Sequence, residues 1–139
     1  MSVRLRRGAS AVEFALPPPV LIFLMMATVE YAWLLFQRTQ AVHAVREGCR
    51  YGATVAYGAS PSPDSLAAAR TKASLVEYSF DADDVTITTT YADLTLDAAG
   101  TMDTLRVEAV LVYRPLMGGL VPTPGGFSVS MSSMLQDAT

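Results

Sequence analysis

The sequence predicts an α+β fold: a long N-terminal helix that crosses a membrane, a second helix, and a small antiparallel β-sheet of about three strands. Three observations predict it. An almost unbroken apolar run occupies the first quarter of the chain. Apolar residues recur at helical spacing in two segments that follow. Three later segments alternate apolar and polar residues and are rich in β-branched types.

The apolar run from Leu16 to Phe36 is long enough to cross a bilayer as a helix. About 20 residues with a rise of ~1.5 Å each span a hydrocarbon core of ~30 Å. No Lys or Arg occurs from Gly8 to Gln37, whereas Arg4, Arg6 and Arg7 precede the run. Positive charge on the N-terminal side predicts a cytoplasmic N-terminus and an exported C-terminal part.

Length and composition limit the number of domains and the kinds of function that the chain can have. The 139 residues suit one domain, and a net charge of −3 offers no basic surface for nucleic acid. A single cysteine, Cys49, excludes an intramolecular disulfide framework in the exported part. We therefore expect one membrane-attached domain that does not bind nucleic acid.

Two helices are expected before the sheet. The first should run from about residue 20 to 57, and the apolar stripe on its outer half consists of Leu35, Val42, Val45, Cys49 and Ala53. Ser62 is expected to cap the second helix, with Pro63 at its first position. The inner stripe of this second helix is expected to consist of Leu66, Ala69, Ala73, Val76 and Phe80.

Three strands are expected in the C-terminal half. Residues 85–91 and 127–132 alternate, and the serines of the latter segment should face outward. Residues 105–113 become apolar on both faces in their second half, which is typical of a central strand. Pro115 should end that strand, and an apolar, glycine-containing loop follows it up to Gly126.

A charged residue interrupts the start of the apolar run. Glu13 follows Gly8 by five residues and precedes Phe14. By itself, Glu13 could simply lie among the lipid headgroups, where a charge costs little. The order of arginines, Gly8, Ala9, small residues, Glu13 and Phe14 nevertheless resembles the site that prepilin peptidases cut.

The resemblance extends along the first third of the chain. Residues 7–17, Arg-Gly-Ala-Ser-Ala-Val-Glu-Phe-Ala-Leu-Pro, resemble the start of TadE-like minor pilins (pseudopilins) of the tight-adherence, or Flp, pilus system. Val29-Glu30-Tyr31 and the stretch 44–53, Ala-Val-Arg-Glu-Gly-Cys-Arg-Tyr-Gly-Ala, resemble further segments of that family. Cys49 stands where the family usually has alanine. The resemblance is dense over residues 6–57 and patchy beyond.

The resemblance implies a pilin-like domain plan. Residues 1–8 would be a leader cleaved after Gly8, residues 9–57 the transmembrane assembly helix, and residues 58–139 an extracytoplasmic α+β domain. Pro17-Pro18-Pro19 is a triple where one proline is common, so the helix is expected to break or kink there.

The resemblance also implies a role and partners. Ala9 would become the new N-terminus, and its amine would pair with the Glu13 carboxylate of the same or a neighbouring subunit, which sets the register of assembly. The partners would be other pilins of the filament, the prepilin peptidase, the inner-membrane assembly platform and the bilayer. The chain would pass once through the inner membrane and later enter a periplasmic or extracellular filament for adhesion, secretion or cell contact.

Other interpretations stay open from the sequence. The chain could instead remain uncleaved, as a single-pass anchored adaptor of the same envelope machinery. Glu30, beside Tyr31 and Trp33, could be a hydrated interfacial carboxylate or a polar contact between packed helices. Four residues of the family segment, Arg46, Glu47, Arg50 and Tyr51, could stabilise the helix and contact the sheet, with Glu47 pairing with Arg50, or could contact another subunit.

Catalytic chemistry has little support. His43 is expected to face solvent or an interface. Cys49 is expected to be a buried thiol, with an intersubunit disulfide or a nucleophile as alternatives. The aspartates of the later loops lack the spacing of a calcium loop. Because no nucleophile elbow, zinc motif or phosphate loop occurs, we expect no enzyme activity, no catalytic residue, no metal and no cofactor.

Overall fold

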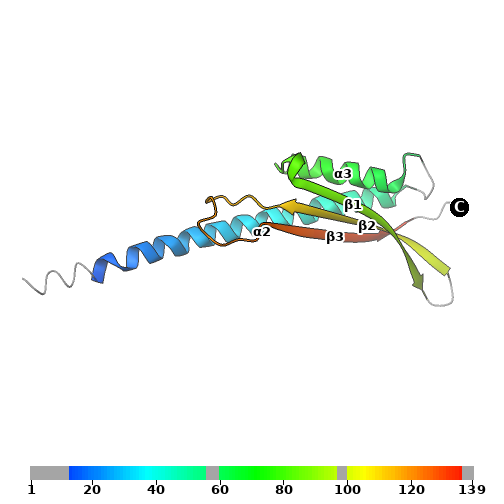
Figure 1. Ribbon diagram of the computed structural model, residues 1–139. Coiled ribbons are helices and arrows are strands. Elements are labelled where there is room, and N and C mark those ends of the chain that lie inside the picture. Colours follow the sequence, from blue (N-terminus) through cyan, green and yellow to red (C-terminus); the bar gives the residue numbers. More distant parts are fainter. Residues whose placement is uncertain (1–12, 56–59, 97–99, 136–139) are drawn as a thin grey trace, which may run out of the picture. The chain divides into compact units, whose positions relative to one another are not determined.

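The computed structural model describes residues 13–55, 60–96 and 100–135, and for 92–96 and 100–103 it describes the backbone alone. Its elements are helix α2 (Pro17–Ala53), helix α3 (Pro63–Glu77), a short 3-10 helix η1 (Ala82–Asp84), and strands β1 (Val85–Leu96), β2 (Gly100–Val112) and β3 (Gly126–Met134) (Figure 1). The predicted α+β class, with two helices and a three-stranded antiparallel sheet, is confirmed.

The chain forms two compact units. The first comprises residues up to Leu35 together with Pro115–Thr123, and the second comprises Phe36–Arg114 with Pro124–Thr139. Helix α2 contributes residues to both units.

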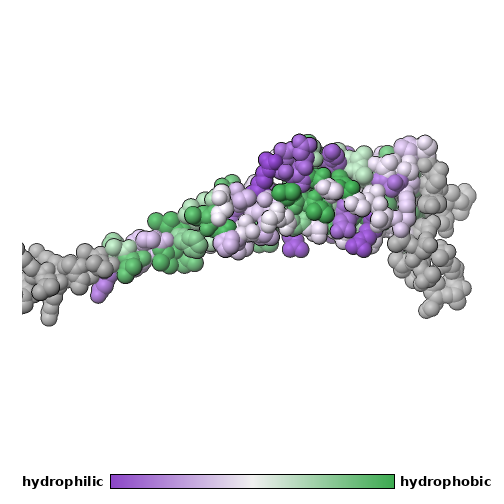
Figure 2. Space-filling model, viewed as in Figure 1, coloured by the Kyte–Doolittle hydropathy of each residue, from purple (hydrophilic) through white to green (hydrophobic). Residues whose placement is uncertain are grey.

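In the first unit, α2 begins directly after a bend at Leu16, which follows a helical turn at Glu13–Ala15. The three prolines therefore occupy the first positions of α2. At these positions an amide has no partner within the helix, so the missing proline N–H groups cost little. From here to Leu35, most large apolar side chains of α2 are exposed, and they give this part of the helix a hydrophobic surface (Figure 2).

The second unit is built on a sheet of order β1-β2-β3, in which both pairs are antiparallel. β2 is the central strand, as its sequence predicted. Odd-numbered residues of β2 from Leu105 to Leu111 are buried, and they share a core with Val129 of β3 and with side chains of α2 and α3. The opposite face of the sheet exposes Val110 and Val112 as well as Ser128, Ser130 and Ser132 of β3.

Helix α3 begins where its sequence predicted, with Ser62 as N-cap residue and Pro63 in the first turn. The side chain of Ser62 makes no capping bond to the backbone. Instead, Tyr91 of β1 holds this end, because its hydroxyl donates to Oδ1 of Asp64 at 2.8 Å and accepts from the Asp64 N–H at 3.1 Å.

The predicted inner face of α3 is wrong at three of its five residues. Its buried residues are Pro63, Ala67, Thr71, Ser74 and Leu75. Of the predicted stripe, Val76 and the alanines at 69 and 73 are exposed, whereas Leu66 is half-buried and Phe80 packs against the core as expected. The reason is that α3 approaches α2 closely and there buries small side chains rather than its most apolar stripe.

The other end of α3 turns through a left-handed residue. Ser79 has φ of 68°, the N–H of Phe80 donates to the oxygen of Leu75, and the N–H of Ser79 donates to the oxygen of Val76. This pair of bonds is the Schellman motif, in which glycine usually takes the position of Ser79.

Candidate functional site

The carboxylate of the predicted assembly site lies just before the proline turn. Glu13 is exposed, and the structure gives it no hydrogen-bond partner among the described residues. Its neighbour Phe14 is 79% exposed. Gly8 and Ala9 of the predicted cleavage site lie outside the described residues, so cleavage and the pairing of Glu13 stay predictions.

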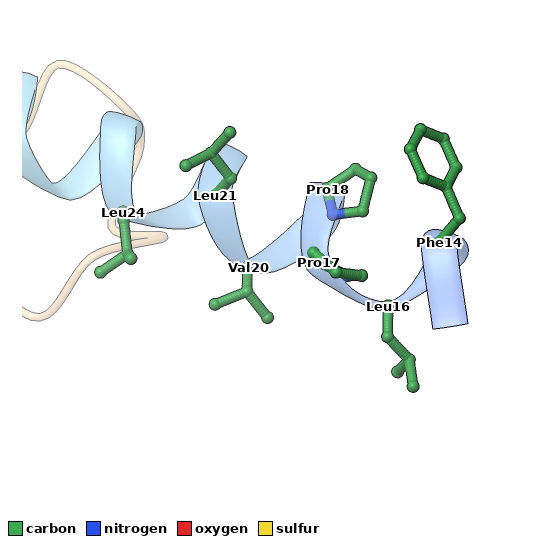
Figure 3. A pocket seen from close by; sticks show the side chains of 7 residues that line it. All are labelled: Phe14, Leu16, Pro17, Pro18, Val20, Leu21 and Leu24. Carbon is green, nitrogen blue, oxygen red and sulfur yellow. The ribbon is translucent and has the colours of Figure 1, made fainter. Parts of the chain in front are cut away.

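An open apolar groove of about 640 Å³ runs along this start of the helix. Phe14, Pro18 and Leu21 point to one side of the helix, and Leu16, Val20 and Leu24 point to the other (Figure 3). The described residues give the groove no opposing wall. A surface of this kind suits lipid chains or another apolar helix rather than a polar ligand.

Glu30 is fully buried in the first unit, with 0% exposure. Its Oε1 accepts the N–H of Leu116 at 3.0 Å, and its Oε2 accepts the N–H of Met117 at 2.9 Å. Burying a carboxylate is tolerable only when hydrogen bonds replace its water. The sequence left open a hydrated carboxylate or a contact between packed helices. The structure instead shows a carboxylate bound to backbone amides of the loop that follows β2.

That loop has an ordered internal geometry. Met117 accepts the N–H of Leu120 at 3.3 Å, and the intervening Gly118 and Gly119 have φ of 61° and 83°. Positive φ at both central residues is the requirement of a type I′ turn, and glycine meets it without steric cost. The hydroxyl of Tyr31 donates to the oxygen of Pro122 at 3.0 Å, so the loop is bonded to α2 on both sides of the turn.

In the second unit, the family segment of α2 faces α3. Glu47 accepts Nε of Arg70 at 3.0 Å on Oε1 and the hydroxyl of Ser74 at 3.1 Å on Oε2. These two bonds, that of Arg70 foremost, lower the pKa of Glu47. The predicted pairing with Arg50 is not the one observed, because α3 brings Arg70 to the same carboxylate.

Two glycines of α2 make room for α3. A Cβ added to Gly48 would lie 1.8 Å from Oγ1 of Thr71, and one added to Gly52 would lie 2.7 Å from Cβ of Ala67. Both distances are shorter than van der Waals contact, so only glycine permits this separation of the helices. Their four-residue spacing places them on one face of α2, and that spacing was visible in the sequence.

Three further residues of the segment lie on the surface. Arg46, Arg50 and Tyr51 are exposed, and the structure gives the two arginines no acceptor among the described residues. Their predicted contact with another subunit stays a prediction. His43 is exposed as well.

Cys49 is buried against the sheet. Its thiol donates to the oxygen of Leu105 at 3.5 Å, and burial raises its pKa. A raised pKa lowers the fraction of reactive thiolate. The geometry therefore favours the interpretation of an inert thiol over that of a nucleophile.

Of the aspartates weighed as calcium ligands, Asp81 and Asp84 form ion pairs with Arg114. Within residues 13–55, 60–96 and 100–135, no three His, Cys, Asp or Glu side chains gather as metal ligands.

These features define a class of protein: an α+β chain whose described residues hold one helix, within Glu13–Ala53, that is long and apolar enough to cross a membrane. The sequence model of the family described as TadE-like protein matches residues 8–50. This match confirms the resemblance to TadE-like proteins over that segment. No curated protein and no solved structure was found to match the chain.

Sequence reasoning missed the partners of two predicted residues. Glu30 binds the backbone amides of Leu116 and Met117, which lie 86 and 87 residues further along the chain. No side-chain pattern in the sequence predicts a contact with backbone groups. Arg70 and Ser74 carry no signal of their own either, since they meet Glu47 only because two glycines let the helices approach.

Proposed function

We propose that the chain is a minor pilin of a tight-adherence-type pilus, a structural subunit without enzymatic activity that primes, caps or stabilises the filament. The observation that carries the proposal is the family match over residues 8–50, which covers both the Gly8–Glu13 segment and the apolar part of α2. In this proposal the chain crosses the inner membrane once, with its N-terminus in the cytoplasm. The prepilin peptidase then removes residues 1–8.

Glu13 supports the assembly role by its position. It is an exposed carboxylate at the start of an exposed apolar helix, and the described residues of its own chain give it no partner. When such helices pack together away from water, an unpaired carboxylate is costly. The amine of Ala9, freed by cleavage, would supply the opposite charge, so that subunits pack in one register.

The surface around Glu13 supports a partner of apolar chemistry. The exposed groove from Phe14 to Leu24 would lie against lipid before assembly and against the helices of other pilins afterwards. The assembly platform of the inner membrane would deliver the subunit from the first environment to the second.

The cleavage step is tested by the intact mass of the protein extracted from membranes of cells with and without the prepilin peptidase. We expect the mass to fall by that of residues 1–8 only when the peptidase is present, and Gly8→Val to block the loss. Gly125→Ala, at a glycine with open space around it, is the control and should be processed normally. An intact Met1–Gly8 segment in the presence of peptidase would instead identify an uncleaved, anchored adaptor.

The assembly step is tested by replacing Glu13. Glu13→Leu should insert in the membrane as before but be depleted at least several-fold from sheared filaments. Glu77→Leu, the same change at an exposed position of α3, is the matched control and should enter filaments normally. Normal incorporation of the Glu13 variant would refute the pairing role while leaving the family assignment intact.

A further inference from the structure

The loop Pro115–Thr123 has a composition unlike that of an ordinary exposed loop. Its sequence is Pro-Leu-Met-Gly-Gly-Leu-Val-Pro-Thr, without a charged residue and with one polar side chain. Leu116 and Leu120 are 57% and 59% exposed. The side chains of Leu116 and Leu120 are thus exposed on a loop whose backbone is ordered by the turn at Gly118 and Gly119.

The loop is bonded to the part of α2 that is apolar enough to lie in a membrane. Glu30 and Tyr31, which bind it, fall between Pro17 and Phe36, the stretch whose length matches a bilayer core. If the span ends near Phe36, then Glu30 lies six residues inside it, about 9 Å at ~1.5 Å per residue. Apolar segments that lie in the interface bury themselves to a depth of about 5–10 Å.

Several backbone amides of the loop have hydrogen-bond partners within the protein. Backbone amides in contact with lipid need partners from the protein, because no water is there to bind them. Glu30 accepts those of Leu116 and Met117, Met117 accepts that of Leu120, and Pro115 and Pro122 have none. A buried carboxylate with two amide donors is in turn better compensated than a bare charge in the span.

We propose that Pro115–Thr123 is a second membrane-contacting element, which places Leu116 and Leu120 in the outer interface of the bilayer and is held at that depth by Glu30 and Tyr31. The occupant of this surface is lipid, because the loop is bonded to Glu30 and Tyr31, within the apolar stretch of α2 that the proposed membrane anchoring puts in contact with lipid. The proposal rests on that anchoring and adds a second point of attachment to it.

The test uses the full chain in lipid vesicles, with Cys49→Ala as background and single cysteines that carry an environment-sensitive fluorophore. The test positions are Leu116 and Leu120. Leu24, exposed on α2, is the membrane control, and Ser128, exposed on β3, is the water control. Lipids that carry a nitroxide at a shallow or a deep position quench the fluorophores that they meet.

We expect labels at Leu116 and Leu120 to be quenched by the shallow nitroxide several-fold more than the label at Ser128, and the label at Leu24 by the deep nitroxide. Labels at both loop positions that match Ser128, with Leu24 still quenched, would overturn the loop proposal alone. A label at Leu24 that is quenched no more than the label at Ser128 would overturn the membrane anchoring, and the loop proposal with it. Loop labels that lipid does not quench but that cross-link between copies would assign the surface to a second copy and reject lipid.

The role of Glu30 is tested in the same vesicles. Glu30→Ala removes both acceptors and should reduce the quenching at Leu120 to the level of Ser128, without moving the label at Leu24. Tyr31→Phe removes the hydrogen bond to Pro122 and should partly reduce the quenching at Leu120. If Glu30→Ala fails to insert in the vesicles, Tyr31→Phe tests the same attachment. Unchanged quenching at Leu120 in both variants would show that these residues do not set the depth of the loop.

Discussion

The two halves of helix α2 differ in which of their residues are exposed and which are buried. In the first unit most of its large apolar side chains are exposed, as Leu24 is at 56%, whereas in the second unit the small residues Ala41, Ala44 and Gly48 are buried. A large exposed apolar surface needs a partner outside the chain, and a face of small residues fits a close partner within it. One continuous helix thus serves two environments through side-chain size and exposure.

The sharpest way to break this comparison is to make the same substitution in both units. Leu105→Ala removes a side chain with 0% exposure from the core of the second unit. It should lower the free energy of unfolding by about 2–5 kcal/mol. Leu24→Ala, in the first unit, should stay within about 0.5 kcal/mol because its side chain is exposed.

Both variants are measured as full chains in detergent micelles, by denaturant unfolding followed with near-UV circular dichroism. Equal losses at the two positions would show that the apolar surface of the first unit is packed within the chain after all.

The next largest effect concerns side-chain size. Gly48→Ala places a methyl group against Thr71 and the carbonyl of Ala67, and should destabilise the second unit by about 1–3 kcal/mol despite the better helix propensity of alanine. Gly125→Ala, with no atom within 4 Å of the added carbon, is the matched control. Thermal unfolding of the two variants compares them, and a stabilised Gly48→Ala would contradict the close approach of α2 and α3.

A smaller effect on stability concerns Glu47 of α2. Glu47 is partly exposed, so Glu47→Gln should cost at most about 1 kcal/mol at neutral pH. Because Arg70 and Ser74 lower the pKa of Glu47 from its ordinary value of 4.5, this stabilisation is present above that pH and is lost as pH falls below it. Unfolding of wild type and Glu47→Gln between pH 7 and about pH 3 should show the difference shrinking. A difference that grows on acidification would contradict the ion pair.

The smallest expected change is a gain. Ser79→Gly relieves the left-handed backbone at φ of 68° and should raise the stability of the second unit by a few tenths to about 1 kcal/mol. Ser79→Ala keeps the strain and is the control. A loss of stability with glycine would show that the serine side chain contributes more than its backbone costs.

The sequence predicted the elements better than their faces. The strands and the start of α3 follow from alternation, from Ser62 and from Pro63, which are local signals. The end of α2 at Ala53, rather than near residue 57, is a small error of the same local kind. The inner face of α3 failed because hydropathy ranks Val76 above Thr71, whereas close packing against Gly48 selects small side chains.

The contact of Glu30 could not be predicted for another reason. Its partners are backbone amides, which every residue except proline has, so only the course of the chain identifies them. The Gly8–Glu13 spacing, in contrast, is a local pattern, and the resemblance that it indicates agrees with the match to the TadE-like model over residues 8–50.

The bond between Glu30 and its loop also has a consequence in time. The two amides belong to residues made 86 and 87 positions after Glu30. At roughly 5–20 residues per second, synthesis reaches them roughly 4–17 s after Glu30. During that interval the Glu30 carboxylate has neither of these two amide donors. We therefore expect the part of α2 around Glu30 to stay in contact with water. The helix would reach its final depth only after the loop has been made.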